Sequence, residues 1–182
     1  MAVVPSIAEA ESLAEELLAP LGNRWLHTQA VAVRAQELAD AVPDEDRDLL
    51  VVAAWLHDIG YARDVVDVGF HPIDGARFLA RRGADGRLCA LVAHHSAATI
   101  EAEERGLAAE LAEWEREEGP VPDALWTADM TTGPRGEHLT YADRLAEIIS
   151  RYRPESAVAQ AMRRARPLVD GAIERTTRGL SG

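Results

Sequence analysis

The feature that most constrains this chain is an unbroken apolar run over residues 49–56 that leads directly into His57 and Asp58. Pro43 and Asp44 supply a start signal upstream, so the run reads as a core helix that ends near this polar pair. A carboxylate held beside apolar surface is costly unless it is paired or bound to a metal. The sequence therefore predicts that a positively charged group or a metal ion lies beside Asp58.

Apolar residues follow a helical period along the whole chain, and no alternating stretch is long enough to require a sheet. Ser6 and Glu9 form a capping box for a first helix, Asn23 is a candidate cap for the second, and Thr140 for a later one. We expect an all-α fold with main helices over about 6–18, 23–39, 43–58, 72–82, 140–152 and 155–177, and shorter helices that end at His95 and Asp129.

Length and composition favour one domain. The chain has 182 residues, 47% of them hydrophobic, which suits a single compact helical bundle over residues 1–182 with its core at about 20–150 and flanking terminal helices. A formal charge of -12 makes extended contact with a nucleic-acid backbone unfavourable. The negative charge does not exclude a small phosphorylated substrate, provided that a few arginines converge in a pocket.

Cysteine use and hydropathy indicate the compartment. The lone Cys89 excludes an intrachain disulfide and fits an inert core thiol in a reducing environment. Glutamates interrupt the N-terminal segment where a signal peptide needs apolar residues, and no run is long enough to span a bilayer. We expect a cytoplasmic protein that does not bind membranes.

Histidines and aspartates recur in a pattern that suits a metal centre. The candidate ligands are His27, His57, Asp58, His71, His94, His95 and Asp129. Mixed imidazole and carboxylate ligands favour iron, manganese, zinc, cobalt or nickel over calcium or magnesium. The sequence thus predicts one or two divalent transition metals, and Asp58 is the natural bridge because its two oxygens can serve two ions. Two such ions lower the pKa of a shared water to about 7 and generate hydroxide at neutral pH.

Two of these ligand assignments remain open from the residues alone. His94 and His95 lie about 100° apart on an ideal helix, so both reach one centre only where the helix ends. Asp143 is an alternative to Asp129 as the last ligand. We favour Asp129, because Asp143 stands in the capping position after Thr140 and has a structural role there. His138 lies outside the pattern.

The order H, HD, H, HH, D resembles the HD-domain superfamily of metal-dependent phosphohydrolases. The resemblance covers about residues 24–145, through Arg24-Trp25-Leu26-His27-Thr28, Leu56-His57-Asp58-Ile59-Gly60, His71-Pro72-Ile73-Asp74-Gly75-Ala76, Val92-Ala93-His94-His95-Ser96 and Ala128-Asp129-Met130. Its motifs are nearest to those of bacterial HD-domain enzymes that cleave symmetrical diadenosine tetraphosphate. That likeness implies that Arg24 binds substrate phosphate and that His95 matches a second-metal ligand better than His94.

Departures from known subgroups narrow the substrate class. Ser96 follows the histidine pair, so the Gly-Tyr-Pro signature of cyclic-di-GMP phosphodiesterases is absent. The Glu-Asp motif of guanosine tetraphosphate hydrolases is also missing, and Tyr61 replaces the lysine common after HD-Ile-Gly. Tyr61 is a candidate hydrogen-bond donor in the pocket. Thr131 and Arg135, in the polar loop after Asp129, are candidate phosphate contacts, with a solvated turn as the alternative.

The acidic stretch over residues 101–118 has two interpretations. It is a solvated helix face, with Leu107, Leu111 and Trp114 directed inward, or a lid over the site. A negatively charged lid would disfavour highly charged nucleotides unless its glutamates point to water.

The leading functional hypothesis is a metal-dependent phosphohydrolase in which a metal-bound hydroxide attacks phosphorus of a nucleotide or other small phosphate ester. Asp58 and Arg24 are its predicted catalytic residues, because cations and Arg24 would stabilise the developing negative charge. Two alternatives use the same ligands. One is a di-iron oxygenase of the same fold, and the other is a non-catalytic binding or signalling module that the metal stabilises.

Overall fold

The protein is an all-α assembly in a computed structural model that describes residues 2–181. Within this range there is no β-strand, only two isolated bridges, Val3 with Ala84 and Thr132 with His138. The α-helices are α1 (Ile7–Leu18), α2 (Asn23–Glu37), α3 (Arg47–Leu56), α4 (His71–Arg81), α5 (Gly86–Ala93), α6 (Ala98–Arg105), α7 (Ala108–Leu111), α8 (Pro120–Met130), α9 (Tyr141–Ser150) and α10 (Ala157–Leu180). Short 3₁₀ turns are η1 (Ala19–Leu21), η2 (Ala39–Ala41), η3 (Asp44–Asp46), η4 (Ile59–Tyr61) and η5 (His95–Ala97).

Local signals explain most helix starts. The Ser6 and Glu9 capping box opens α1 as expected, and the Thr140 hydroxyl caps α9. The prediction that Asn23 caps α2 was wrong. Gly22 holds the cap position with a φ of 59°, a positive value that glycine adopts without steric cost, and Asn23 is the first helical residue.

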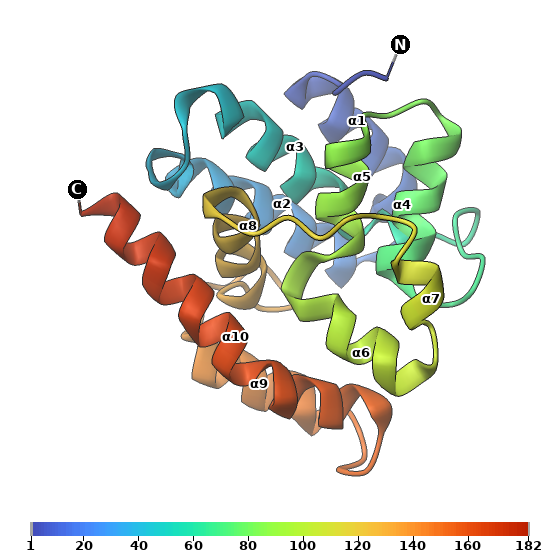
Figure 1. Ribbon diagram of the computed structural model, residues 1–182, viewed down its shortest axis with the longest axis vertical. Helices are drawn as coiled ribbons and strands as arrows, with labels where there is room; N and C mark the ends of the chain where they lie inside the picture. Colours follow the sequence, from blue (N-terminus) through green and yellow to red (C-terminus); the bar gives the residue numbers. More distant parts are fainter. Residues whose placement is uncertain (1, 182) are drawn as a thin grey trace.

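The acidic segment is not one helix. Gly106 ends α6 with a φ of 72°, so only the short α7 continues the helical pattern before the chain becomes irregular. The segment from residue 112 to 119 then crosses the front of the molecule in Figure 1 and leads into α8.

Two helices form the centre of the core and carry the polar residues of interest at their ends. Residues 49–56 of α3 and 121–130 of α8 are all buried, and α3 packs against α1, α2, α5 and α8. A helical segment that is apolar on every side, as residues 49–56 of α3 are, is stable only inside a core. The C-terminal ends of the two helices therefore hold His57, Asp58 and Asp129 in fixed places beneath the surface.

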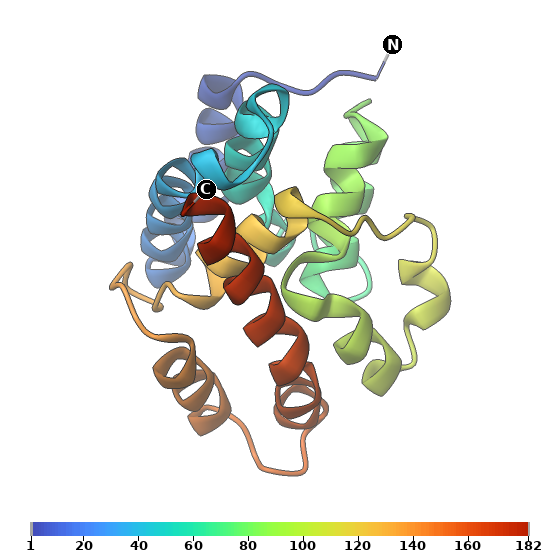
Figure 2. The same cartoon turned by 60° about the vertical axis from the view of Figure 1, so that its left-hand side comes forward.

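The C-terminal helices close the side of the bundle where α3 and α8 end. The long α10 runs across α8 and α6, and α9 lies alongside it (Figures 1 and 2). Ser156 caps α10, and its buried residues, among them Ala161, Ala165 and Val169, recur at helical spacing on the face toward the core. Residues of α9 and α10 thereby line one side of a partly open pocket at this end of the bundle.

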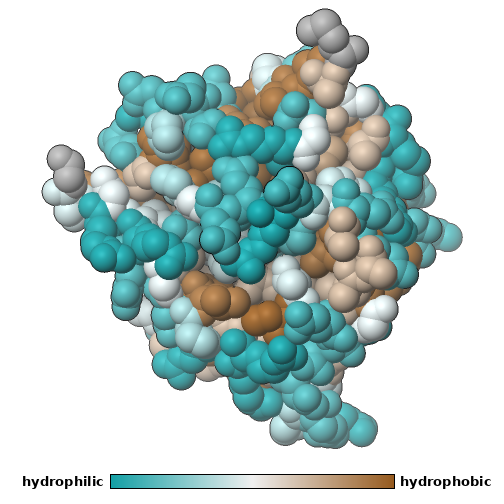
Figure 3. Space-filling model, in the orientation of Figure 1, coloured by the Kyte–Doolittle hydropathy of each residue, from teal (hydrophilic) through white to brown (hydrophobic). Residues whose placement is uncertain are grey.

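The surface is mostly hydrophilic, and hydrophobic residues form small separate patches on the face that Figure 3 shows. Many glutamates of the acidic segment contribute to it through ion pairs. Glu103 and Glu104 pair with Arg164 of α10, and Glu117 pairs with Arg87 at 2.8 Å. Within residues 2–181, no helix combines the length and apolar character needed to cross a membrane.

Cys89 lies on α5 and is buried, in agreement with its predicted place in the core. Burial raises the pKa of its thiol to about 11. The thiolate that reacts with oxidants and metals is therefore scarce at neutral pH, which is the behaviour of an inert core cysteine.

Candidate metal centre

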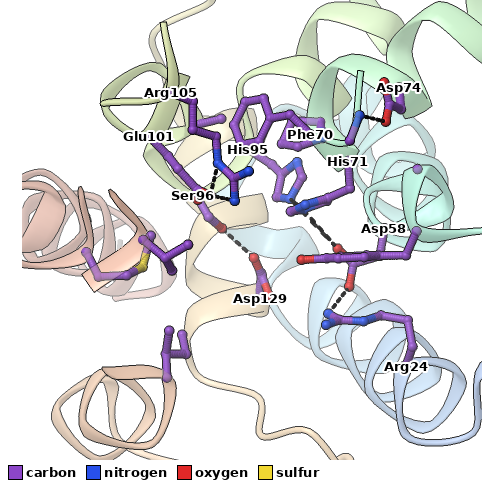
Figure 4. Close-up of a pocket in the computed structure, with 18 of the residues that line it drawn as sticks. Arg24, Asp58, Phe70, His71, Asp74, His95, Ser96, Glu101, Arg105 and Asp129 are labelled. Carbon is purple, nitrogen blue, oxygen red and sulfur yellow. Dashed lines mark hydrogen bonds and ion pairs between the residues drawn. The ribbon is translucent and has the colours of Figure 1, made fainter. Parts of the chain in front are cut away.

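Five segments bring histidines and aspartates together in a cluster of two adjoining groups, and Figure 4 labels four of these residues, Asp58, His71, His95 and Asp129. The cluster takes His27 from α2, His57 and Asp58 from the end of α3, His71 from the start of α4, His95 from the turn after α5, and Asp129 from the last turn of α8. Helix ends suit this purpose because the backbone leaves the helical path there and lets side chains of different elements meet.

One half of the cluster consists of His27, His57 and Asp129, all of them buried. His27 Nε2 lies 3.0 Å from Asp129 Oδ1, and His57 Nε2 lies 3.8 Å from the same oxygen. We call these three residues the inner group. Two imidazole nitrogens and a carboxylate oxygen that face one point form a donor set for a divalent transition metal.

The other half consists of Asp58, His71 and His95. His71 Nε2 lies 3.1 Å from His95 Nε2 and 3.3 Å from Asp58 Oδ1. The His71 side chain is 17% exposed, whereas the His95 side chain is 4% exposed. We call these residues the outer group, because His71 opens toward a cavity.

Asp58 connects the two groups through different oxygens. Its Oδ2 faces the inner group, 3.3 Å from His57 Nε2 and 3.8 Å from His27 Nε2, while its Oδ1 faces His71. Arg24 Nη1 also donates a hydrogen bond to Oδ2 at 2.6 Å. The Asp58 carboxylate thus has the positively charged partner that the sequence predicted, the Arg24 guanidinium. It also lies where it could bridge two ions.

Backbone carbonyls orient three of the histidine rings. The Nδ1 atoms of His27, His57 and His95 lie within hydrogen-bond distance of the carbonyl oxygens of Gly133, Ala54 and Val92. A carbonyl only accepts, so each Nδ1 must carry the proton. In a neutral ring, Nε2 then has the free lone pair, as a metal ligand requires.

Electrostatics distinguish the residues of the cluster. Burial alone would raise the pKa of Asp58, but the Arg24 guanidinium and neighbouring histidines hold it well below its usual range. Burial opposes protonation of His57, yet the carboxylates of Asp58 and Asp129 outweigh it and raise the pKa of His57 to about 9. Burial lowers the pKa of His71 and of His95, so these two rings are neutral near pH 7.

Gly60 allows His71 to approach Asp58. A Cβ atom added to Gly60 would lie 2.0 Å from the backbone oxygen of His71, far inside contact distance. The first residue of α4 therefore packs directly on the η4 backbone. Only glycine permits that approach, so the glycine that follows His-Asp-Ile is required for the packing of α4 against η4.

Sequence reasoning missed the role of Ser96. Its hydroxyl donates a hydrogen bond to Asp129 Oδ2, while Asp129 Oδ1 faces His27. Ser96 and Ala97 adopt φ values of 49° and 59°, a left-handed conformation that is costly for residues other than glycine. No sequence signal marks such a turn, because neither residue type favours it.

The structure separates the histidine pair. His95 lies in the cluster, whereas the α5 cap residue His94 lies outside both groups and has its Nε2 2.8 Å from the backbone oxygen of Trp114. α5 ends at Ala93, so both histidines lie beyond its regular helical path. The alternative last ligand, Asp143, is exposed and accepts a hydrogen bond from the Thr140 hydroxyl.

The predicted substrate contacts occupy different places. The Tyr61 ring stacks on His71 with centroids 4.0 Å apart, and the Arg24 guanidinium lies 4.1 Å from the Tyr61 centroid. Thr131 is buried and its hydroxyl donates to the backbone oxygen of Thr127, so it is committed to the end of α8. Arg135 is exposed on the loop after α8.

A cavity of about 230 Å³ opens beside the outer group. Phe70, Val158 and Met162 give it an apolar wall, and Glu101 with Arg105 forms part of its rim (Figure 4). Glu101 Oε1 accepts a hydrogen bond from Arg105 Nε at 2.7 Å. The acidic segment thus contributes one paired glutamate to the cavity wall.

One buried nitrogen without a hydrogen-bond partner indicates that the inner group fits a divalent transition metal. His57 Nε2 is buried, and although Asp58 Oδ2 lies 3.3 Å away, this nitrogen forms no hydrogen bond among the described residues. A buried polar nitrogen without a partner is costly, and a metal ion bound between His57, His27 and Asp129 would satisfy it. The cluster can therefore hold metal, and its mixed donors suit iron, manganese, zinc, cobalt or nickel.

Comparison with known proteins is consistent with this geometry. Residues 24–151 match the profile of the family described as HD domain. A curated protein of Picrophilus torridus, named tRNA (cytidine(56)-2'-O)-methyltransferase, is 37% identical over 79 residues, which cover 43% of this chain and 22% of that protein. The chain thus spans about a fifth of that relative's length, and no solved structure matched significantly.

The family match extends over more than half of the chain and includes each residue of the inner and outer groups. The helical fold and the His-Asp cluster agree with it. On these grounds the chain belongs to the HD domain family.

Proposed function

We propose that this protein is a metal-dependent phosphohydrolase that acts on a nucleotide or another small phosphate ester. The inner group, with Asp58 Oδ2, would hold one divalent transition metal, and the outer group, with Asp58 Oδ1, a second. The observation that carries the proposal is the position of Asp58, whose Oδ2 lies 3.3 Å from His57 Nε2 and whose Oδ1 lies 3.3 Å from His71 Nε2.

When bound, such ions polarise phosphoryl oxygens and lower the pKa of a bound water enough to supply a nucleophile at neutral pH. The chain itself contributes positioning. Asp58 directs one carboxylate oxygen toward each group. The histidines whose Nδ1 atoms bond to backbone carbonyls keep their Nε2 atoms available as metal ligands. Arg24 lies beside Asp58 and lines the cavity, where a guanidinium stabilises charge that develops on phosphoryl oxygens.

The volume and the lining of the cavity favour a compact substrate. Its 230 Å³ is below the range of about 300 to 1,000 Å³ typical of ligand pockets. Apolar side chains such as Phe70 and Met162 would contact an organic group, while the metals and Arg24 would take the phosphate. A net charge of -12 further favours a small molecule over a nucleic-acid polymer.

Phosphate release from p-nitrophenyl phosphate and bis(p-nitrophenyl) phosphate tests the proposal. Metal-free protein would be reconstituted separately with iron, manganese, zinc, cobalt and nickel. We expect hydrolysis with at least one metal and its loss in Asp58→Asn, with His94→Ala as the control for a buried histidine outside the cluster. Oxygen uptake by the iron form without hydrolysis of either ester, or metal binding with neither activity, would contradict the proposal.

A further inference from the structure

A second hollow, about 300 Å³ in volume, adjoins the metal cavity. Arg24, Arg144 and Arg151 line both spaces, and Arg135 adds a fourth guanidinium to the hollow. The remaining lining residues are Asn23, His27, Pro134 and Glu147. Four arginines around one small space are notable in a chain with a net charge of -12.

Carboxylates only partly neutralise this arginine hollow. Arg24 pairs with Asp58, and Arg144 and Arg151 share the single carboxylate of Glu147. Glu137 accepts a hydrogen bond from the backbone N–H of Arg135, but within residues 2–181 the Arg135 guanidinium forms no ion pair. Four guanidinium groups against the three neighbouring carboxylates of Asp58, Glu137 and Glu147 still leave an excess of positive charge that an anion would offset.

Arg144 provides an independent indication of a ligand. It is only 5% exposed, and its Nε is buried without a hydrogen-bond partner in the described part of the chain. A desolvated cationic donor with no acceptor is costly. Because Arg144 lines both the cavity and the hollow, an anion that passes between them would come within its reach.

We propose that the arginine hollow is an anion subsite that takes a second phosphoryl group of the substrate. This inference rests on the proposed function, because the first phosphoryl group would lie at the metal cluster. Guanidinium groups bind phosphate oxygens through paired hydrogen bonds, and the first turn of α2, at Asn23, adds the positive end of a helix. The substrate class is then a molecule with two linked or neighbouring phosphates, and a simple monoester would leave the hollow unused.

A matched pair of ligands that cannot be hydrolysed tests the subsite. Calorimetry would compare methylenediphosphonate with methylphosphonate on protein that carries the metal it retains on purification. We expect the diphosphonate to bind at least about tenfold more tightly. Arg135→Gln and Arg151→Gln should each lower diphosphonate affinity by about five- to tenfold and methylphosphonate affinity by less than about twofold.

Arg153→Gln is the control, since it removes the same charge from an exposed position two residues after Arg151 that lines neither space. Arg144→Lys keeps the buried charge but removes the Nε donor, and it should also weaken the diphosphonate selectively. Equal affinity for the two ligands, or equal losses in Arg153→Gln and Arg151→Gln, would overturn the subsite.

The subsite and the proposed function can fail separately. Ester hydrolysis without any preference for the diphosphonate would refute the subsite and leave the hydrolase intact. Selective diphosphonate binding by a protein that hydrolyses no ester would refute the hydrolase and retain the anion site. Metal content and melting temperature, measured on each variant, show whether the substitution has disturbed the cluster or the fold.

Discussion

The inner and outer groups share Asp58 but differ in how firmly the fold holds them. Inner-group residues are all buried, both imidazoles are fixed by backbone carbonyls, and Asp129 is fixed by Ser96. In the outer group, a backbone carbonyl also fixes His95, but His71 is partly exposed, begins a helix and stacks on Tyr61. Because hydrogen bonds from surrounding groups to the ligands raise the affinity of a metal site, we expect an ion in the inner group to bind more tightly than an ion in the outer group.

The substitution with the largest expected effect removes what the two groups share. Asp58→Asn should lower phosphate release on the order of a thousandfold and reduce metal content below one ion per chain, since it deprives both groups of a charged ligand and leaves Arg24 without its counter-ion. Elemental analysis and an ester assay measure both effects. Wild-type metal content in this variant would remove Asp58 from its bridging role.

Single histidine substitutions should distinguish the two groups. After dialysis against a weak chelator, His71→Ala should keep about one ion per chain, and His57→Ala should keep almost none, because only the inner group is fully enclosed. His94→Ala is the matched control and should keep the wild-type content. Equal retention in His57→Ala and His71→Ala would show that the groups do not differ.

Metal removal should destabilise the protein mainly through the inner group. A ligand that binds only the folded state at a thousand times its Kd adds about 4 kcal/mol, so we expect chelation to lower the Tm by about 10 °C. His71→Ala should show most of this drop on chelation, and His57→Ala little of it. A wild-type Tm that chelation leaves unchanged would contradict a tightly held inner ion.

Ser96 should affect the inner group alone. Ser96→Ala removes the hydrogen bond to Asp129, so the inner ion should bind about tenfold more weakly, with the outer ion changed less. Ser96→Gly is the informative partner, because it also lacks the hydroxyl but relieves the left-handed backbone at φ 49°. If metal affinity, measured by competition with a chelator, falls in only one of these variants, backbone conformation and not the hydroxyl is responsible.

Tyr61 offers the smallest and most local test. Tyr61→Leu removes the ring that stacks on His71 and should weaken the outer ion about threefold, while Tyr61→Phe keeps the stack and should bind it normally. Competition with a chelator measures the metal affinity of both variants. A similar loss in the two variants would assign the effect to the phenolic hydroxyl instead.

Local rules predicted much of this structure. The Ser6 capping box, the prolines at helix starts and the apolar run before His57 act over a few residues, and they fixed the helical class and most helix positions. The order of histidines and aspartates likewise indicated a metal site of the HD type. These features depend on short spacings that a sequence displays directly.

What the sequence did not reveal depends on three-dimensional placement. The family likeness favoured His95 over His94, but the residues alone left the pair open, because the separation of the two side chains depends on where α5 ends. The Ser96 contact requires two non-glycine residues in the left-handed conformation. The arginine hollow combines α2, the loop after α8 and α9, which lie far apart in the chain. No local pattern encodes such a meeting of distant segments.

Titration of the metal-free protein tests the central claim most directly, with bound metal per chain and the rate of phosphate release from p-nitrophenyl phosphate measured on the same samples. We predict that the first equivalent fills the inner group with little activity and that hydrolysis rises with the second. Binding of no metal, full activity after one equivalent, or two bound ions with no phosphate release would contradict this account.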